Sequence, residues 1–153
     1  MATLTGTYNL DPAHSSIGFT VRHAMVTKVR GNFPEFTAQL TVDGENPKAI
    51  ATIKTASIDT GDESRDAHLR TADFFDVETY PTIDFVSTGV RYEGGDFLVD
   101  GDLTIRGITK PVTFEVEFGG FGTDPWGNYK AGATAKTVIN REDFGLAWNA
   151  ALE

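Results

Sequence analysis

The side chains of this sequence best suited to chemistry are three histidines, His14, His23 and His68, and the neighbouring Arg65. An imidazole can donate or accept a hydrogen bond near neutral pH, and a guanidinium offers a fork of donors to an oxygen-rich group. Arg65 and His68 have a spacing that places both on one face of a helix, the face we expect to turn toward the interior. Long polar side chains there cost free energy unless they find a partner or a ligand. The stretch 60–81 is therefore the first place to look for a function.

The sequence contains no short motif for metal binding or catalysis. No pair of histidines has the spacing of H-x-H or H-E-x-x-H, and there is no cysteine. Ser15 and Ser16 follow His14, but neither a G-x-S-x-G elbow nor a glycine-rich phosphate loop is present. We therefore predict no metal, no cofactor and no catalytic residue. One enzymatic alternative stays open, in which a histidine acts as general base on a small hydrophobic substrate.

Length and charge restrict the class of protein. The 153 residues suit one domain with its own core, spanning 1–153. A formal net charge of −9 repels phosphate backbones, so nucleic acid is not an expected partner. No apolar run reaches the roughly 18 residues that a membrane-spanning helix needs. The first residues, MATLTGTYNL, lack the basic and apolar regions of a secretory signal. We expect a cytoplasmic protein without an integral membrane segment.

Apolar and polar residues alternate along most of the chain, the pattern of strands with one dry and one wet face. The dry positions include Ile17, Phe19, Val21 and His23; Phe36, Ala38, Leu40 and Val42; Leu103 and Ile105; and Val112, Phe114, Val116 and Phe118. Turn signals separate these runs at Asp43-Gly44, Gly94-Gly95, Arg106-Gly107 and Gly119-Gly120. The sequence therefore predicts one all-β domain of about eight strands, without the alternation of strands and helices typical of parallel sheets.

One short helix around residues 62–74 is the exception to this pattern. Thr60 and Glu63 have the spacing of a capping box. Asp66, Arg70 and Asp73 form a second stripe of this helix, which we expect to face solvent. A single helix cannot cover a large flat sheet, but it could lie across the mouth or flank of a closed one.

The side chains available to line a closed sheet are mixed in size. A barrel of about eight strands removes exposed edges and is wide enough to hold one small ligand. Ala131, Ala133 and Ala135 put small side chains on one face of a late strand, opposite strands rich in phenylalanine. Either these alanines leave a cavity or they fill the core together with the phenylalanines. The pattern alone leaves both alternatives open.

Long ordered motifs occur at intervals along the chain. The most specific is Arg65-Asp66-Ala67-His68-Leu69, followed by Asp73-Phe74-Phe75 and Tyr80-Pro81. Others are Asp11-Pro12-Ala13-His14-Ser15, Arg30-Gly31-Asn32-Phe33, Ala56-Ser57-Ile58-Asp59-Thr60, Gly101-Asp102-Leu103-Thr104-Ile105-Arg106-Gly107, and Arg141-Glu142-Asp143-Phe144-Gly145 with Trp148. With these motifs the chain resembles the YceI-like family of polyisoprenoid-binding, lipocalin-like proteins over nearly its whole length. Tyr8 stands where the family commonly carries tryptophan.

The resemblance implies a single eight-stranded antiparallel β-barrel, lipocalin-like, with an accompanying helix and an elongated apolar tunnel. It implies a ligand rather than a reaction: a long-chain amphiphile such as a prenyl quinone, a polyprenyl phosphate or, in some members, a fatty-acid amide. The expected role is binding, storage or transport of that lipid. Homodimerisation is a further expectation from the resemblance. A structural or interaction module with a filled core is the third alternative.

These expectations assign the candidate ligand-binding residues. We expect the polar mouth of the barrel to be formed by His14, His23, Arg65 and His68. We expect its apolar lining to include Phe19, Phe36, Phe85, Phe114 and Ala133. Asp66 and Arg141 are expected to act as structural hydrogen-bond partners.

Overall fold

The computed structural model describes residues 6–23, 27–43 and 46–146, which contain nine strands and one α-helix. The strands are β1 (Gly6–Asn9), β2 (Gly18–His23), β3 (Thr27–Asn32), β4 (Phe36–Asp43), β5 (Asn46–Lys54), β6 (Thr82–Glu93), β7 (Asp96–Ile105), β8 (Ile108–Thr123) and β9 (Tyr129–Lys136). The helix α1 (Glu63–Leu69) is accompanied by three 3₁₀ turns, η1 (Pro12–His14), η2 (Thr55–Ser57) and η3 (Arg141–Phe144).

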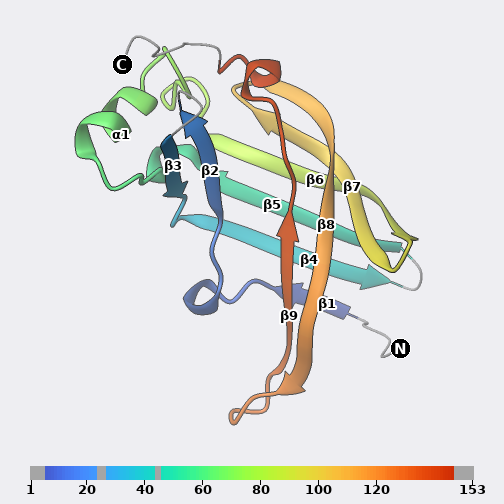
Figure 1. Ribbon diagram of the computed structural model, residues 1–153. Coiled ribbons are helices and arrows are strands. Elements are labelled where there is room, and N and C mark those ends of the chain that lie inside the picture. Colours follow the sequence, from blue (N-terminus) through green and yellow to red (C-terminus); the bar gives the residue numbers. More distant parts are fainter. Residues whose placement is uncertain (1–5, 24–26, 44–45, 147–153) are drawn as a thin grey trace.

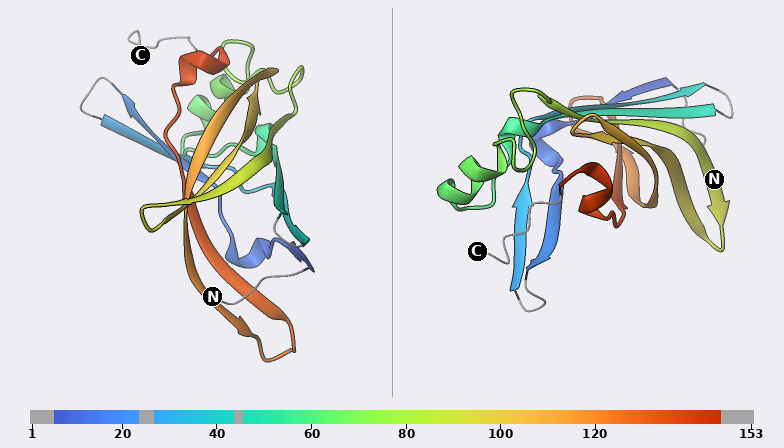
Figure 2. Two further views of the ribbon diagram at one scale, coloured as in Figure 1. Left: turned by 90° about the vertical axis from the view of Figure 1, so that its right-hand side faces the viewer. Right: turned by 90° about the horizontal axis from the view of Figure 1, so that it is seen from above.

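The strands form one large curled sheet and one small ribbon. Seven strands pair in the order β1-β4-β5-β6-β7-β8-β9, every pair antiparallel, while β2 pairs with β3 alone. Figures 1 and 2 show the large sheet curling into a half-barrel, with η3 inside the curl. The predicted all-β, antiparallel, barrel-like class with a single helix is confirmed. The described part has nine strands instead of the predicted eight. Only seven of them belong to the large sheet, because β2 and β3 form a ribbon of their own.

One face of the large sheet is mostly apolar, and we call it the inner face. It carries Ile83, Leu103 and Ile105, and the register places further residues beside them, because directly opposed residues of antiparallel strands share a face. These residues include Tyr8 and Leu40; Phe36, Ile53 and Ile83; Ala38, Ala51 and Phe85; Phe97 and Val116; Val99 and Phe114; and Phe118 and Ala133. The apolar positions predicted in 36–42 and 112–118 therefore lie on the inner face.

Two β-bulges keep apolar side chains on the inner face at points where the apolar residues no longer alternate regularly with polar ones. The register shifts between Ser87 and Gly89 in β6, and again between Phe118 and Gly120 in β8. An extra residue in one strand moves all following side chains to the opposite face. Beyond the shift in β8, Phe121 lies opposite Ala131 on the inner face. The turn predicted at Gly119-Gly120 is therefore wrong, because these glycines form a bulge inside one long strand.

The packed end of the inner face lies under η3 and the segments that follow β3, η2 and α1. Its buried apolar side chains are Phe33, Ile58, Phe74, Ile83, Leu103, Ile105, Phe144 and Leu146. Arg106 ties the covering segments together by donating to the carbonyls of Gly145 at 2.6 Å and Ala72 at 2.8 Å. These bonds hold η3 and the loop after α1 against the β7–β8 turn.

The helix is shorter than predicted, and two of the three residues of its second stripe are not solvated; the third, Asp73, is 53% exposed as predicted. Asp62, not Thr60, caps α1 by accepting the backbone N–H of Arg65 at 3.1 Å. Asp66 is buried and accepts from the N–H and the hydroxyl of Thr60, at 3.0 and 2.5 Å. Arg70 donates to the carbonyls of Ala56 and Ile58.

The prediction that Asp66 and Arg70 face solvent is therefore wrong, because α1 is held against the segment 55–60 by these very side chains. The expectation that Asp66 acts as a structural partner is confirmed. Arg141 opens η3, and its carbonyl accepts the N–H of Leu146 at 3.1 Å.

Candidate ligand-binding site

The inner face is open where it runs away from the packed end. We call Tyr92, Phe97, Phe118 and Phe121 the open end. Tyr92 is 64% exposed, Phe118 38% and Phe121 42%. Their rings nevertheless form a continuous row, with centroids 5.0 Å apart for Tyr92 and Phe97, 5.2 Å for Phe97 and Phe118, and 5.7 Å for Phe118 and Phe121. A contiguous exposed apolar surface of this kind is typical of a binding site.

Phe85 and Phe114 lie between the packed end and the open end. Their rings meet edge to face at 5.1 Å although they come from β6 and β8, on either side of β7. Gly101 of β7 makes this contact possible, because any side chain at this position would collide with the Phe85 ring. The glycine thereby lets a large ring lie against the backbone of the inner face.

Small residues on β9 complete the same face. Ala131 lies opposite Phe121, Ala133 opposite Phe118, and Ala135 opposite Val116. Each pair sets a small side chain beside a large one. The methyl groups of β9 and the larger side chains of β8 together form an exposed apolar strip along these two strands.

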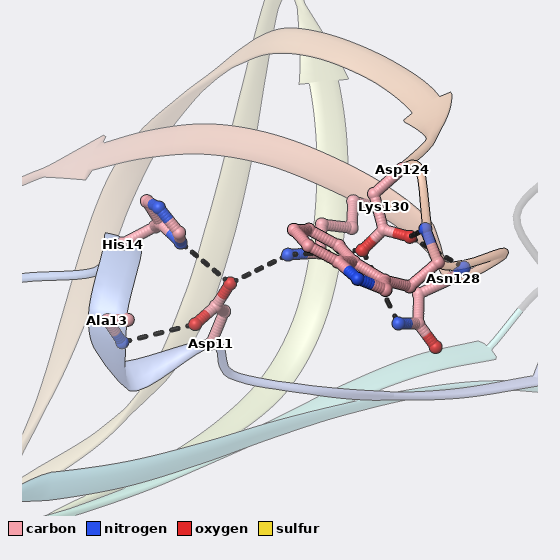
Figure 3. A network of polar contacts seen from close by, with 7 residues as sticks. Asp11, Ala13, His14, Asp124, Asn128 and Lys130 are labelled. Atoms are coloured by element: carbon pink, nitrogen blue, oxygen red, sulfur yellow. Dashed lines mark hydrogen bonds and ion pairs between the residues drawn. The ribbon is translucent and has the colours of Figure 1, made fainter.

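The two edge strands of the sheet approach each other at a seam formed by side chains. Tyr8 of β1 and Tyr129 of β9 have ring centroids 6.5 Å apart. Lys130 of β9 contacts Asp11 at 2.9 Å and Asp124 at 3.5 Å (Figure 3). Among the strands that the structure describes, β1 and β9 share no backbone ladder. The half-barrel is therefore closed here by rings and ion pairs rather than by backbone hydrogen bonds.

The charges of the seam largely satisfy one another. The Lys130 ammonium, followed by the His14 ring whose Nδ1 lies 2.9 Å away, holds the pKa of Asp11 well below its usual range. Asp11 in turn raises the pKa of Lys130. The backbone N–H of Asn128 is the main cause of a lowered pKa at Asp124. Two carboxylates thus surround one ammonium, which leaves little free positive charge for an anionic head group.

The residues predicted for the polar mouth lie in separate places. His14 lies at the seam, whereas Arg65 and His68 lie in α1, at the other end of the molecule in Figures 1 and 2. Arg65 donates to the hydroxyl of Thr60 at 2.9 Å, and the His68 ring contacts Asp73 at 3.0 Å and Phe74 edge to face. His23 ends β2 opposite Thr27, and its side chain lies outside the described part. The structure does not gather the four around one opening, and their role in binding stays a prediction.

The residues predicted for the lining divide between the two sheets. Phe36, Phe85, Phe114 and Ala133 all lie on the inner face. Phe19 belongs to the ribbon and packs at the packed end, with its ring 5.5 Å from Phe33. Their contact with a ligand likewise stays a prediction.

Sequence reasoning missed part of the surface that the structure brings together. The additional residues are Tyr8, Tyr92, Phe97, Phe121 and Tyr129. The aromatic residues on both sides of Gly119-Gly120 were a usable signal, once that pair is understood as a bulge.

Shallow grooves also lie beside the packed end and on the opposite face of the sheet. One, of about 350 Å³, lies between β8 and residues 137–140, and the other, of about 240 Å³, lies over Asn9, Gln39 and Ile50. No histidine lines either groove. Within the described ranges no three side chains are grouped as metal ligands. None of the helices in the described part is long and apolar enough to cross a bilayer.

Comparison with known proteins gives a consistent result. The model of the YceI-like domain matches residues 8–153. A UPF0312 protein of Photorhabdus laumondii is 43% identical over 150 residues, which are 95% of this chain and 78% of that protein. Protein YceI of Escherichia coli is 41% identical over 136 residues, 87% of this chain and 71% of the relative.

Solved structures agree with these sequence matches. The crystal structure of the Campylobacter jejuni YCEI protein superposes with a TM-score of 0.72 at 33% identity, covering 90% of this chain and 83% of that one. A polyisoprenoid-binding domain from Saccharophagus degradans has a TM-score of 0.58 at 19% identity, with 74% and 68% coverage. At that identity the second likeness shows the fold alone.

Proposed function

Because this chain belongs to the YceI-like family, we propose that it binds a polyisoprenoid amphiphile along the inner face of its curled sheet. The observation that carries the proposal is the open end, where a row of aromatic rings remains exposed on the concave side of the sheet. The related fold described as a polyisoprenoid-binding domain supports the choice of ligand class. The role that follows is to store or transport a lipid that is insoluble by itself.

Burial energetics explain why the tail should dominate the affinity. Each CH₂ group removed from water contributes about 0.8 kcal/mol before ordering costs are subtracted. A hydrogen bond to the head group contributes roughly 0.5–1.5 kcal/mol net. A few isoprene units therefore outweigh any single polar contact. Phe36, Phe85, Phe114 and Ala133 are the proposed tail contacts, and His14 at the seam is the proposed head-group contact closest to the open end.

Uptake of ligand by the lipid-stripped protein tests the proposal. The protein is offered prenyl quinones of increasing tail length and, separately, a polyprenyl phosphate, and complexes are counted by native mass spectrometry. We expect uptake that increases with tail length. Absence of any complex with either ligand would contradict the proposal.

A matched pair of variants on β9 places the ligand. Ala133→Phe places a ring beside Phe118 on the inner face, whereas Thr134→Phe adds the same ring to the opposite face of the strand. We expect Ala133→Phe to reduce uptake at least tenfold and Thr134→Phe to leave it unchanged. Equal uptake by the two variants would show that the ligand lies elsewhere.

A further inference from the structure

The β8–β9 hairpin extends beyond the rest of the sheet and ends in an exposed tryptophan. Figures 1 and 2 show its tip, residues 124–128, as the part of the molecule that projects farthest past the neighbouring strands. Trp126 is 83% exposed at this tip. Tryptophan is a large apolar side chain that is normally well buried, so its display at a projecting tip needs an explanation.

The exposure of Trp126 is built into an ordered turn. A carboxylate oxygen of Asp124 accepts the backbone N–H groups of Trp126 and Asn128, both at 2.9 Å. The Asp124 backbone also bonds with Asn128 at 2.8 Å and with Gly127 at 3.1 Å. Gly127 has a φ of +84°, which a glycine adopts without strain. These bonds fix the turn, so the exposed indole is carried by an ordered segment.

The hairpin tip is surrounded by aromatic and charged side chains, a combination that suits the interface of a bilayer. Phe121 and Tyr129, 42% and 48% exposed, flank the turn. The charged groups of the seam adjoin the turn: Lys130 follows Tyr129 in β9 and contacts Asp11 and, within the turn, Asp124 (Figure 3). Aromatic residues prefer the level of the lipid head groups, and charged groups beside them limit the depth of insertion.

We propose that this hairpin tip docks the protein on the surface of a phospholipid bilayer, with Trp126 inserted among the head groups. A protein partner is a poorer fit, because a stable protein–protein interface buries about 800 Å² per partner, whereas one tryptophan supplies only about 150–250 Å². The net charge of −9 opposes anionic surfaces, so the bilayer is a zwitterionic one.

Docking by the tip would bring the open end to the place where an amphiphile is found. Phe121 adjoins the turn, and its ring stacks on Phe118 at 5.7 Å, so an apolar path leads from the tip onto the inner face. Membrane docking goes beyond the proposed function and does not depend on it, because it needs no isoprenoid cargo.

Flotation of the full chain with phosphatidylcholine vesicles that contain no isoprenoid tests this proposal. We expect the wild-type protein to float, and Trp126→Ser to lower its partition coefficient about tenfold, a loss of the size expected for one partly buried aromatic ring. Val138→Ser is the control, because Val138 is 96% exposed but lies after β9, away from the tip. It should float as the wild type does. Thermal unfolding of each variant shows that it is folded.

Four results would overturn the proposal. The first is no flotation of the wild-type protein, and the second is equal flotation of Trp126→Ser. The third is a wild-type dimer that Trp126→Ser dissociates while vesicles bind neither protein. Vesicles enriched in phosphatidylserine should bind the wild type no better than phosphatidylcholine does, and stronger binding would also contradict it.

Discussion

The inner face is packed at one end and open at the other, although one alternation of residues builds both. At the packed end, Phe144 of η3 is 2% exposed, in a segment that Arg106 holds against the inner face. At the open end, Phe118 is 38% exposed although the rings of Phe97 and Phe121 contact it. Phenylalanine therefore serves two different purposes in this protein. Phenylalanine buried against the inner face stabilises the fold, while phenylalanine exposed on that face offers apolar area to a ligand.

The largest expected effect comes from removing a ring at each end. Phe144→Ala should lower the free energy of unfolding by about 3–5 kcal/mol, because it leaves a cavity in a closed core. Phe118→Ala should cost well under half of that in the lipid-free protein, because its ring is already in contact with water. Urea unfolding measures both. Equal losses would mean that the open end is packed in solution.

A matched pair of glycines should give the next largest effect. Gly101→Ala places a methyl group against the Phe85 ring, whereas nothing lies within 4 Å of a methyl group added at Gly120. We expect a loss of about 1–3 kcal/mol for Gly101→Ala from overpacking, and a change within about 0.5 kcal/mol for Gly120→Ala. Urea unfolding again provides the measurement. If Gly101→Ala is neutral, Phe85 does not lie flat over β7.

The smallest expected effect is on stability in acid, and it comes from the ion pair of Asp11 and Lys130 at the seam. Because Lys130 lowers the pKa of Asp11 in the folded protein, the unfolded chain binds more protons as the pH falls. The contribution of Asp11 is therefore present above the ordinary carboxyl pKa of about 4 and is lost below it. We expect Asp11→Asn to flatten the decrease of the melting temperature between about pH 5 and pH 2.

Asp102→Asn, which removes a carboxylate from the opposite face of the sheet, is the control for the acid effect. It should leave the decrease of the melting temperature unchanged. The same slope in Asp11→Asn and the wild type would mean that the ion pair at the seam does not persist in solution.

The sequence predicted local alternation well and its interruptions poorly. Phe36, Ala38 and Leu40 lie on the inner face as expected, because period-two burial is written directly in the residue types. The pair Gly119-Gly120 predicts a turn but forms a bulge, because glycine pairs occur in both and only the pairing with β9 distinguishes them.

Residues whose state depends on distant segments were the hardest to predict. Asp66 is polar and sits on the stripe expected to be solvated, yet it is buried because the Thr60 turn folds back onto it. The separation of His14 from His68 depends on the path of the whole chain, so no local pattern could reveal it. Lys130 and Asp11 are 119 positions apart, and only the curl of the sheet brings them together.

The most direct test of the account measures where a bound tail lies. The natural sequence has no cysteine, so a single one can be introduced at Ala133 on the inner face or at Thr134 on the opposite face. The rate of thiol alkylation is then measured with and without a long-tailed prenyl quinone. We predict that the ligand slows alkylation at position 133 at least tenfold and leaves position 134 unchanged. Equal rates at 133 with and without bound ligand would contradict the account.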